Sequence, residues 1–89
     1  MTVRLTNEGL ISLEGVVLVE DAEPLLQLLL THPAAAIDWR ACDHAHAAII
    51  QILMASGIAP IGPPSGVFMR TVVEPALERY RERAFPKGA

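Results

Sequence analysis

The sequence predicts a single α/β domain whose elements follow the order β-β-α-β-α-β-α. Three observations point to it. Short apolar stretches that alternate with polar residues begin the chain, as in half-buried strands. Longer apolar stretches with helical spacing follow, and short apolar runs separate them. The chain has 89 residues, which is enough for one small domain over residues 1–89.

The first fifteen residues predict a hairpin of two antiparallel strands. Val3 and Leu5 alternate with polar neighbours, the turn residues Asn7–Gly9 follow, and the apolar pattern resumes up to Gly15. We expect this hairpin at an edge of the sheet. Residues 16–19 fit either a strand or a loop.

The first helix is predicted over Ala22–His32. Asp21 is a typical N-cap residue, Pro24 is tolerated in a first turn, and Pro33 follows the expected end. The leucines of this helix cover more than one face. We therefore expect one face to contact the sheet and another to contact a neighbouring helix or a partner.

The stretch Ile37–Gly57 predicts a strand, a loop and a helix, and the other elements are organised around it. Ala34–Trp39 is the expected third strand, parallel and central because it lies between two helices. Its tryptophan is expected in the core. The chain is expected to leave the strand through residues 40–42, and the second helix is predicted over Asp43–Ser56.

The second helix has an outward side without charges. At about 100° per residue its sheet-facing side comprises Ala45, Ala48, Ile49, Ile52, Leu53 and Ser56. The opposite side carries Ile50 and Met54 beside the small Ala47, where an exposed helix normally carries charged side chains. Two explanations stay open. A partner covers this side, or the first or third helix covers it within the monomer.

The remaining chain predicts one more strand and one more helix. Ile58–Gly62 is the expected fourth strand, at an edge because Pro60 interrupts it. The last helix is predicted over Val67–Phe85, with Ser65 as its cap and a kink or break at Pro75. Its expected apolar stripe comprises Phe68, Val72, Val73, Ala76, Leu77 and Tyr80.

Composition limits the classes of partner. The chain is 52% hydrophobic and 19% charged, with a mean hydropathy of +0.37, so surplus apolar side chains are expected at an interface. A net charge of -3 argues against nucleic-acid binding. Cys42 is the only cysteine and fits a reducing compartment. The first residues lack the pattern of a signal peptide, and glycines and prolines interrupt the apolar stretch after residue 56. We therefore expect a cytoplasmic protein that does not span a membrane.

Polar side chains gather where the third strand is expected to meet the second helix. They are Asp38, Arg40, Cys42, Asp43, His44 and His46. A metal site would use Cys42, Asp43, His44 and His46, with His32 as a further candidate, yet no second cysteine or HxxxH pattern completes a tetrahedral set of ligands. Nucleophilic catalysis would use Cys42 with His46 as base and Asp38 as orienting acid, yet a chain this short offers little room for a substrate pocket. We therefore expect no enzyme activity, no metal and no cofactor.

The favoured interpretation of this region is a protein-binding surface. An apolar centre with a polar border is the usual anatomy of a modest interface. The predicted partner-binding residues are Asp38, Arg40, Asp43, His44, His46, Ala47, Ile50 and Met54.

The order of elements and the central stretch resemble a STAS domain, a family that includes anti-sigma-factor antagonists and cytoplasmic parts of transporters. The shared features are Leu13-Glu14-Gly15 after the hairpin, Glu20-Asp21-Ala22 before the first helix, and Ile37-Asp38-Trp39 at the third strand. More narrowly, residues 43–55 read DHAHAAIIQILMA. They are similar to small stand-alone bacterial members that read EHLHTAxLQxLLA.

The resemblance implies a mixed four-stranded sheet packed with three to four helices. It also implies a non-catalytic signalling module that binds a sigma-factor-regulating kinase, a similar regulator or a second copy, through the second helix and the preceding loop. One alternative is a cytoplasmic subunit of a lipid or anion transport complex, and another is a small metal-binding or enzymatic domain that uses Cys42 and His46. In regulated antagonists an Asp-Ser pair opens this helix and the serine is phosphorylated. His46 and Ala47 take those places here, so no phosphorylation switch is expected at this position.

Overall fold

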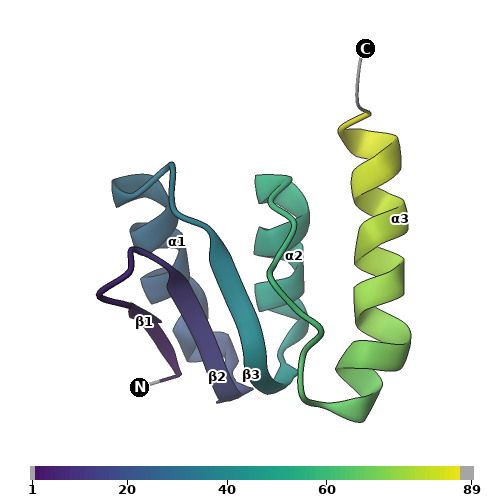
Figure 1. The fold of residues 1–89 in the computed structure, drawn as a ribbon, viewed down its shortest axis with the longest axis horizontal. Helices are drawn as coiled ribbons and strands as arrows, with labels where there is room; N and C mark the ends of the chain where they lie inside the picture. The colour runs from purple at the N-terminus through teal and green to yellow at the C-terminus, as the bar shows by residue number, and fades with distance from the viewer. Residues whose placement is uncertain (1, 87–89) are drawn as a thin grey trace.

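The computed structural model describes residues 2–86, which form a three-stranded mixed sheet and three α-helices (Figure 1). The elements in chain order are β1 (Val3–Leu5), β2 (Ile11–Val17), the 3₁₀ turn η1 (Val19–Asp21), α1 (Ala22–Thr31), β3 (Ile37–Ala45), α2 (Ala47–Ser56), the π-helical segment η2 (Met69–Val73) and α3 (Glu74–Ala84). The predicted α/β class is confirmed.

The sheet has the order β1-β2-β3. β1 is antiparallel to β2, with Val3 opposite Leu13, and β3 is parallel to β2, with Ile37 beside Ile11. The predicted hairpin and the parallel third strand are thereby confirmed. Helices α1 and α2 lie on one side of the sheet, and α3 stands beside α2 at the end of the helix row (Figure 1).

The predicted fourth strand is reduced to one parallel bridge between Asp38 and Ile61. The N–H of Ile61 donates to the carbonyl of Ile37 at 2.7 Å, and its carbonyl accepts from the N–H of Trp39 at 3.1 Å. Three prolines within residues 60–64 lack the N–H that a longer ladder requires. β3, which was expected in the centre of the sheet, therefore has a full neighbouring strand only on its β2 side within residues 2–86.

The prediction that the third strand ends at residue 39 is wrong, because β3 continues to Ala45. Relative to β2 it carries one extra residue opposite Ser12–Glu14 and another opposite Gly15–Val16. Such bulges keep a strand paired while they change which side chains face the core. The fully or nearly buried residues of this half are Trp39, Cys42 and Ala45, three positions apart. The second helix accordingly begins at Ala47 instead of Asp43.

The core lies between the sheet and the helices. Each helix contributes at least one buried side chain, such as Leu25 of α1, Leu53 of α2 and Leu77 of α3. Complete burial of an aliphatic side chain of this size contributes about 1.5–3 kcal/mol. Trp39 is fully buried, as predicted. The other buried hydrophobic residues are Val3, Ile11, Leu13, Val17, Ile37, Cys42, Ala45, Ile49 and Met69.

The predicted irregularity at Pro75 takes the form of the π-helical segment directly before it. The N–H of Glu74 donates to the carbonyl of Met69, five residues earlier, so the helical path continues through a wider turn. A proline in a helix has no N–H to donate and its ring clashes with the preceding turn. The wider turn of η2 accommodates Pro75 without ending the helix.

The wider turn also changes which side of the last helix faces the core. The inward side chains are those of Met69, Val73 and Leu77. Four members of the predicted apolar stripe are exposed instead, namely Phe68, Val72, Ala76 and Tyr80. The predicted stripe is therefore correct only for Val73 and Leu77.

Candidate functional site

The structure divides the eight predicted partner-binding residues into three groups. Asp38 and Arg40 form a pair on β3. Asp43, His44, His46 and Ala47 are exposed where β3 ends and α2 begins. Ile50 and Met54 are half-buried and pack against the core.

Asp38 and Arg40 are bound to each other. The guanidinium of Arg40 donates to both carboxylate oxygens of Asp38, with Nη2 to Oδ2 at 2.8 Å and Nε to Oδ1 at 3.0 Å. Hydrogen bonds from this guanidinium and from the Arg40 backbone N–H lower the pKa of Asp38. Since the pair satisfies itself, it has less to offer a partner than two free charges would.

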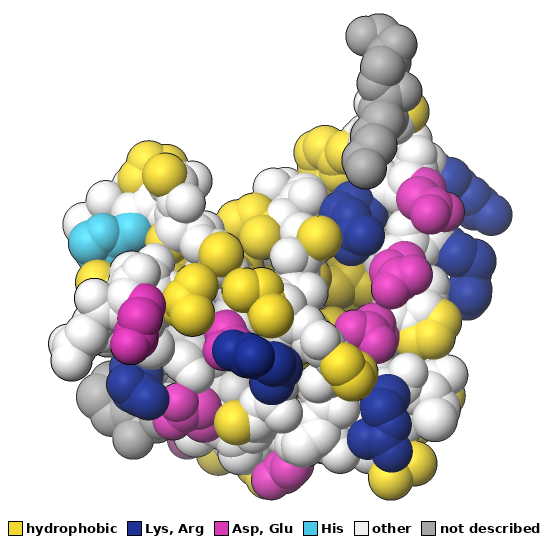
Figure 2. Space-filling model, in the orientation of Figure 1, with side chains coloured by type: hydrophobic (Ala, Val, Ile, Leu, Met, Phe, Trp, Pro, Cys, Tyr) yellow, Lys and Arg dark blue, Asp and Glu magenta, His cyan; other side chains and the backbone are white. Residues whose placement is uncertain are grey.

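A second ion pair lies on the neighbouring strands. Arg4 Nη2 is 2.9 Å from Glu14 Oε2, and the hydroxyl of Ser12 donates to the same oxygen at 2.7 Å. Hydrogen bonds from Arg4 and then Ser12 lower the pKa of Glu14. Figure 2, in the orientation of Figure 1, shows acidic and basic side chains interspersed over this face of the molecule. Self-paired charges of this kind are typical of a solvated sheet face.

Stability is expected to fall in acid because of these two carboxylates. The pKa values of Asp38 and Glu14 are lowered in the fold from their ordinary values of 3.8 and 4.5. Their contribution is therefore complete above those values and is lost as the pH falls through the lower folded-state values. Urea unfolding at pH 6 and pH 3 checks this. The double variant Asp38→Asn, Glu14→Gln should lose less stability over that interval, and an equal loss in both proteins would contradict the assignment.

His46 forms the N-cap of α2. Its Nδ1 accepts a hydrogen bond from the backbone N–H of Ala48 at 3.0 Å. The backbone N–H of His46 donates to the carbonyl of Val17 at 2.9 Å. A histidine side chain in this position satisfies one of the free N–H groups of a helix start.

The segment before the last helix is attached to the end of β3. The Ser65 hydroxyl donates to Asp43 Oδ1 at 2.7 Å, and the N–H of Gly66 donates to the carbonyl of Cys42 at 3.1 Å. Ser65 was predicted as a helix cap, but its side chain bonds to Asp43. This attachment places Val67 next to the end of the third strand.

Three chain segments therefore converge at the carboxyl ends of β2 and β3, and each exposes apolar side chains. Val16 pairs with His44 in the sheet. Leu18 follows Val17, whose carbonyl accepts the backbone N–H of His46. Val67 and Phe68 are 66% and 57% exposed. We call this surface the carboxyl-end patch, and it comprises Val16, Leu18, His44, His46, Ala47, Val67 and Phe68.

Ile50 and Met54 do not form the bare outward side that the sequence predicted. Both are half-buried, and both pack against the core. The exposed line of α2 is instead Ala47, Gln51 and Ala55, spaced by four residues. The helix still has no charged side chain, so its outward surface is flat and uncharged.

Cys42 is a core residue of the sheet. Its side chain is fully buried, and this burial raises the pKa of the thiol to about 11. A catalytic cysteine needs an accessible thiol that ionises readily. No group of three or more His, Cys, Asp or Glu side chains within residues 2–86 is arranged to hold a metal ion. These facts count against the alternative that uses Cys42 and His46.

The native thiol of Cys42 is expected to react slowly. With a pKa of about 11, roughly one thiol in a thousand is ionised at pH 8. We expect a thiol reagent to modify the folded protein at least about a hundredfold more slowly than the urea-unfolded protein at that pH. Comparable rates in the two states would show that Cys42 is accessible.

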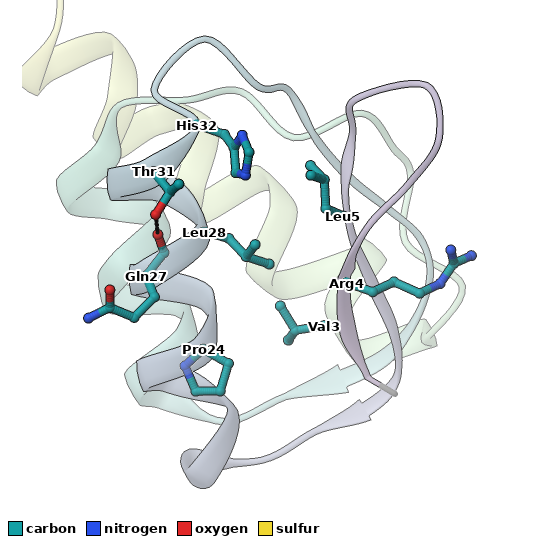
Figure 3. A pocket seen from close by; sticks show the side chains of 8 residues that line it. All are labelled: Val3, Arg4, Leu5, Pro24, Gln27, Leu28, Thr31 and His32. Atoms are coloured by element: carbon teal, nitrogen blue, oxygen red, sulfur yellow. Dashed lines mark hydrogen bonds between the residues drawn. The ribbon is translucent and has the colours of Figure 1, made fainter.

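An open groove of about 410 Å³ runs between β1 and α1 (Figure 3). Val3, Leu5 and Leu28 point into it from the two sides, and His32 lies at one end, whereas the side chain of Arg4 points away. The lining residues include no nucleophile paired with a base. This groove therefore offers apolar surface and no catalytic arrangement.

Comparison of the chain with protein-family models, curated proteins and solved structures finds no match in any of the three. The resemblance to STAS domains therefore stays a prediction from the sequence. Within residues 2–86 no helix has both the length and the apolar character needed to cross a bilayer.

Proposed function

We propose that this chain is a non-catalytic protein-interaction module and that its partner binds at the carboxyl-end patch. The observation that carries the proposal is the convergence of three exposed apolar segments around the start of an uncharged helix. The resemblance stated above favours a sigma-factor-regulating kinase or a similar signalling protein as the partner. On the same resemblance we also propose that the chain is a STAS-like domain with a cytoplasmic location.

The composition of the patch is that of an interface. Phe68 and Val67 supply large apolar side chains, and aromatic residues often provide the main anchors of binding sites. Asp43, whose carboxylate accepts a hydrogen bond from Ser65, and the exposed His44 supply a polar border. We therefore assign Phe68 as the central contact, a residue that the sequence pattern had placed in the core.

Ala47 leaves no site for phosphorylation at the start of α2. It is the first residue of α2 and is exposed. It has no hydroxyl that a kinase can modify, and a phosphate there would repel an apolar partner through charge and desolvation. The patch is therefore competent to bind in the unmodified protein.

Two substitutions test this surface. Phe68→Glu and Ala47→Glu each place a charge in the patch without removing a buried side chain. We expect both to release a partner captured from an extract of the source cells. The matched control is Leu30→Glu, because Leu30 is 67% exposed but lies at the end of α1. Circular dichroism verifies that all three variants fold.

The result separates the candidate functions. Loss of a signalling protein in both patch variants, but not in the control, supports the proposal. Loss of a membrane transport subunit in the same pattern supports the second candidate, a transport-complex subunit, for which the large apolar patch is also suited. A partner that stays bound to both patch variants shows that the interface is elsewhere.

A further inference from the structure

β1 is an edge strand of the sheet (Figure 1), and β2 is the only strand that pairs with it within residues 2–86. The N–H of Thr6 donates to the carbonyl of Leu10 at 2.7 Å, so Thr6 bonds across the hairpin. In an antiparallel pair, residues that bond in this way alternate with residues whose N–H and C=O groups point away. Arg4 therefore also bonds to β2, whereas Val3 and Leu5 direct their backbone groups to the outer edge. Such groups are a template for a further strand.

The apolar groove between β1 and α1 lies directly beside this edge (Figure 3). Val3 and Leu5 direct their side chains into the groove from β1, and Leu28 reaches it from α1. The one lining residue with an acidic, lysine or arginine side chain is Arg4, which points away from the groove and pairs with Glu14. The edge therefore offers backbone hydrogen bonds, and the groove beside it is complementary to apolar side chains without charge.

We propose that β1 binds an extended peptide segment of another protein, which adds a strand to the sheet and places apolar side chains in the groove. An extended peptide presents N–H and C=O groups at the spacing of those on the edge strand. A helix uses its own N–H and C=O groups internally, so it would leave the edge unsatisfied. Side chains opposite each other on paired strands share one face of the sheet. The ligand residues opposite Val3 and Leu5 therefore enter the groove and are apolar, with one residue of any polarity between them.

This site shares no residue with the carboxyl-end patch and does not depend on the proposed function. The strand that receives the peptide has only three residues, and each backbone hydrogen bond contributes modestly because it replaces a bond to water. Binding of a short peptide is therefore expected to be weak. The ligand side chains in the groove supply the selectivity for apolar residues at alternate positions.

Nuclear magnetic resonance of the full chain tests this site with two synthetic peptides. Both have blocked ends and seven residues in which serine and leucine alternate, and the second carries N-methyl groups on its leucines. The methyl groups remove the N–H donors but keep the side chains, so the second peptide should bind at least about tenfold more weakly. At saturation the first peptide should slow hydrogen exchange at the amides of Val3 and Leu5 by about tenfold or more. Arg4 should change little, because its N–H is already bonded within the sheet.

Leu5→Pro makes the matching change in the protein. Proline lacks the outward N–H and is tolerated on an edge strand, so this variant should fold and bind the first peptide at least about tenfold more weakly. The matched control is Leu30→Ser, which removes an exposed leucine outside the groove and should leave binding unchanged. If Leu5→Pro does not fold, the comparison of the two peptides on the wild type still decides.

Several results would overturn the proposal. They are failure of the first peptide to bind, equal binding of the two peptides, and binding that leaves the amides of Val3 and Leu5 unprotected. Protection of these amides in the protein alone, increasing with its concentration, would show that a second copy occupies the edge instead.

Discussion

Replacement of Gly66 by alanine is expected to lower the free energy of unfolding by about 3 kcal/mol. A Cβ at this position would lie 1.8 Å from the carbonyl oxygen of Asp43, which belongs to the backbone of β3 and has no freedom to rotate away. Gly66 also donates its backbone N–H to the carbonyl of Cys42. The substitution therefore separates the start of the last helix from the strand that supports it. Urea unfolding followed by circular dichroism measures the loss.

Gly9→Ala is the matched control for this experiment. Gly9 has a positive φ of +82°, but a Cβ there would meet no atom within 4 Å. Alanine should therefore cost about 1 kcal/mol, through its backbone conformation alone. If Gly66→Ala unfolded at the same urea concentration as Gly9→Ala, the close approach to Asp43 would be disproved.

Met54→Glu is expected to lower the free energy of unfolding by about 2–4 kcal/mol. Met54 is half-buried and packs against the core, so a carboxylate there loses water without gaining a partner. Thermal unfolding should show a midpoint lower by about 10 °C or more, because 1 kcal/mol corresponds to roughly 4–8 °C in a domain of this size.

The neighbouring substitution Ala55→Glu provides the comparison. Ala55 is exposed on the outward line of α2, so its replacement should change stability by no more than about 0.5 kcal/mol. Equal stability of the Met54 and Ala55 variants would restore the view that Met54 faces outward. The expected difference also means that Met54 is unsuitable for testing binding, whereas Ala47 is suitable.

Local patterns in the sequence predicted most of the fold. The alternation of Val3 and Leu5, the turn at Asn7–Gly9 and the proline after α1 correspond to the observed hairpin and first helix. The second half of β3 was missed because its two bulges replace alternation by burial at every third residue. That spacing resembles a helix when only the sequence is read. The second helix was therefore predicted to begin at Asp43, whereas it begins at Ala47.

The candidate site was predicted in part. Asp43, His44, His46 and Ala47 are exposed together near the start of α2, as their adjacency in the chain indicates. Their neighbours Val16 and Phe68 were missed, because only the parallel pairing of β2 with β3 and the attachment of residues 65–66 bring distant segments to the same place. Contacts over such sequence distances leave no periodic signal.

The π-helical turn at Met69–Val73 sets the direction in which the side chains of α3 point. A π turn is an α-helix with one inserted residue. Reverting this segment to α geometry without changing its length would rotate the following residues by about 100° relative to Phe68. Arg79 and Arg83 would then point in a new direction although their own sequence had not changed. The backbone geometry of this short segment therefore decides which residues α3 displays to other molecules.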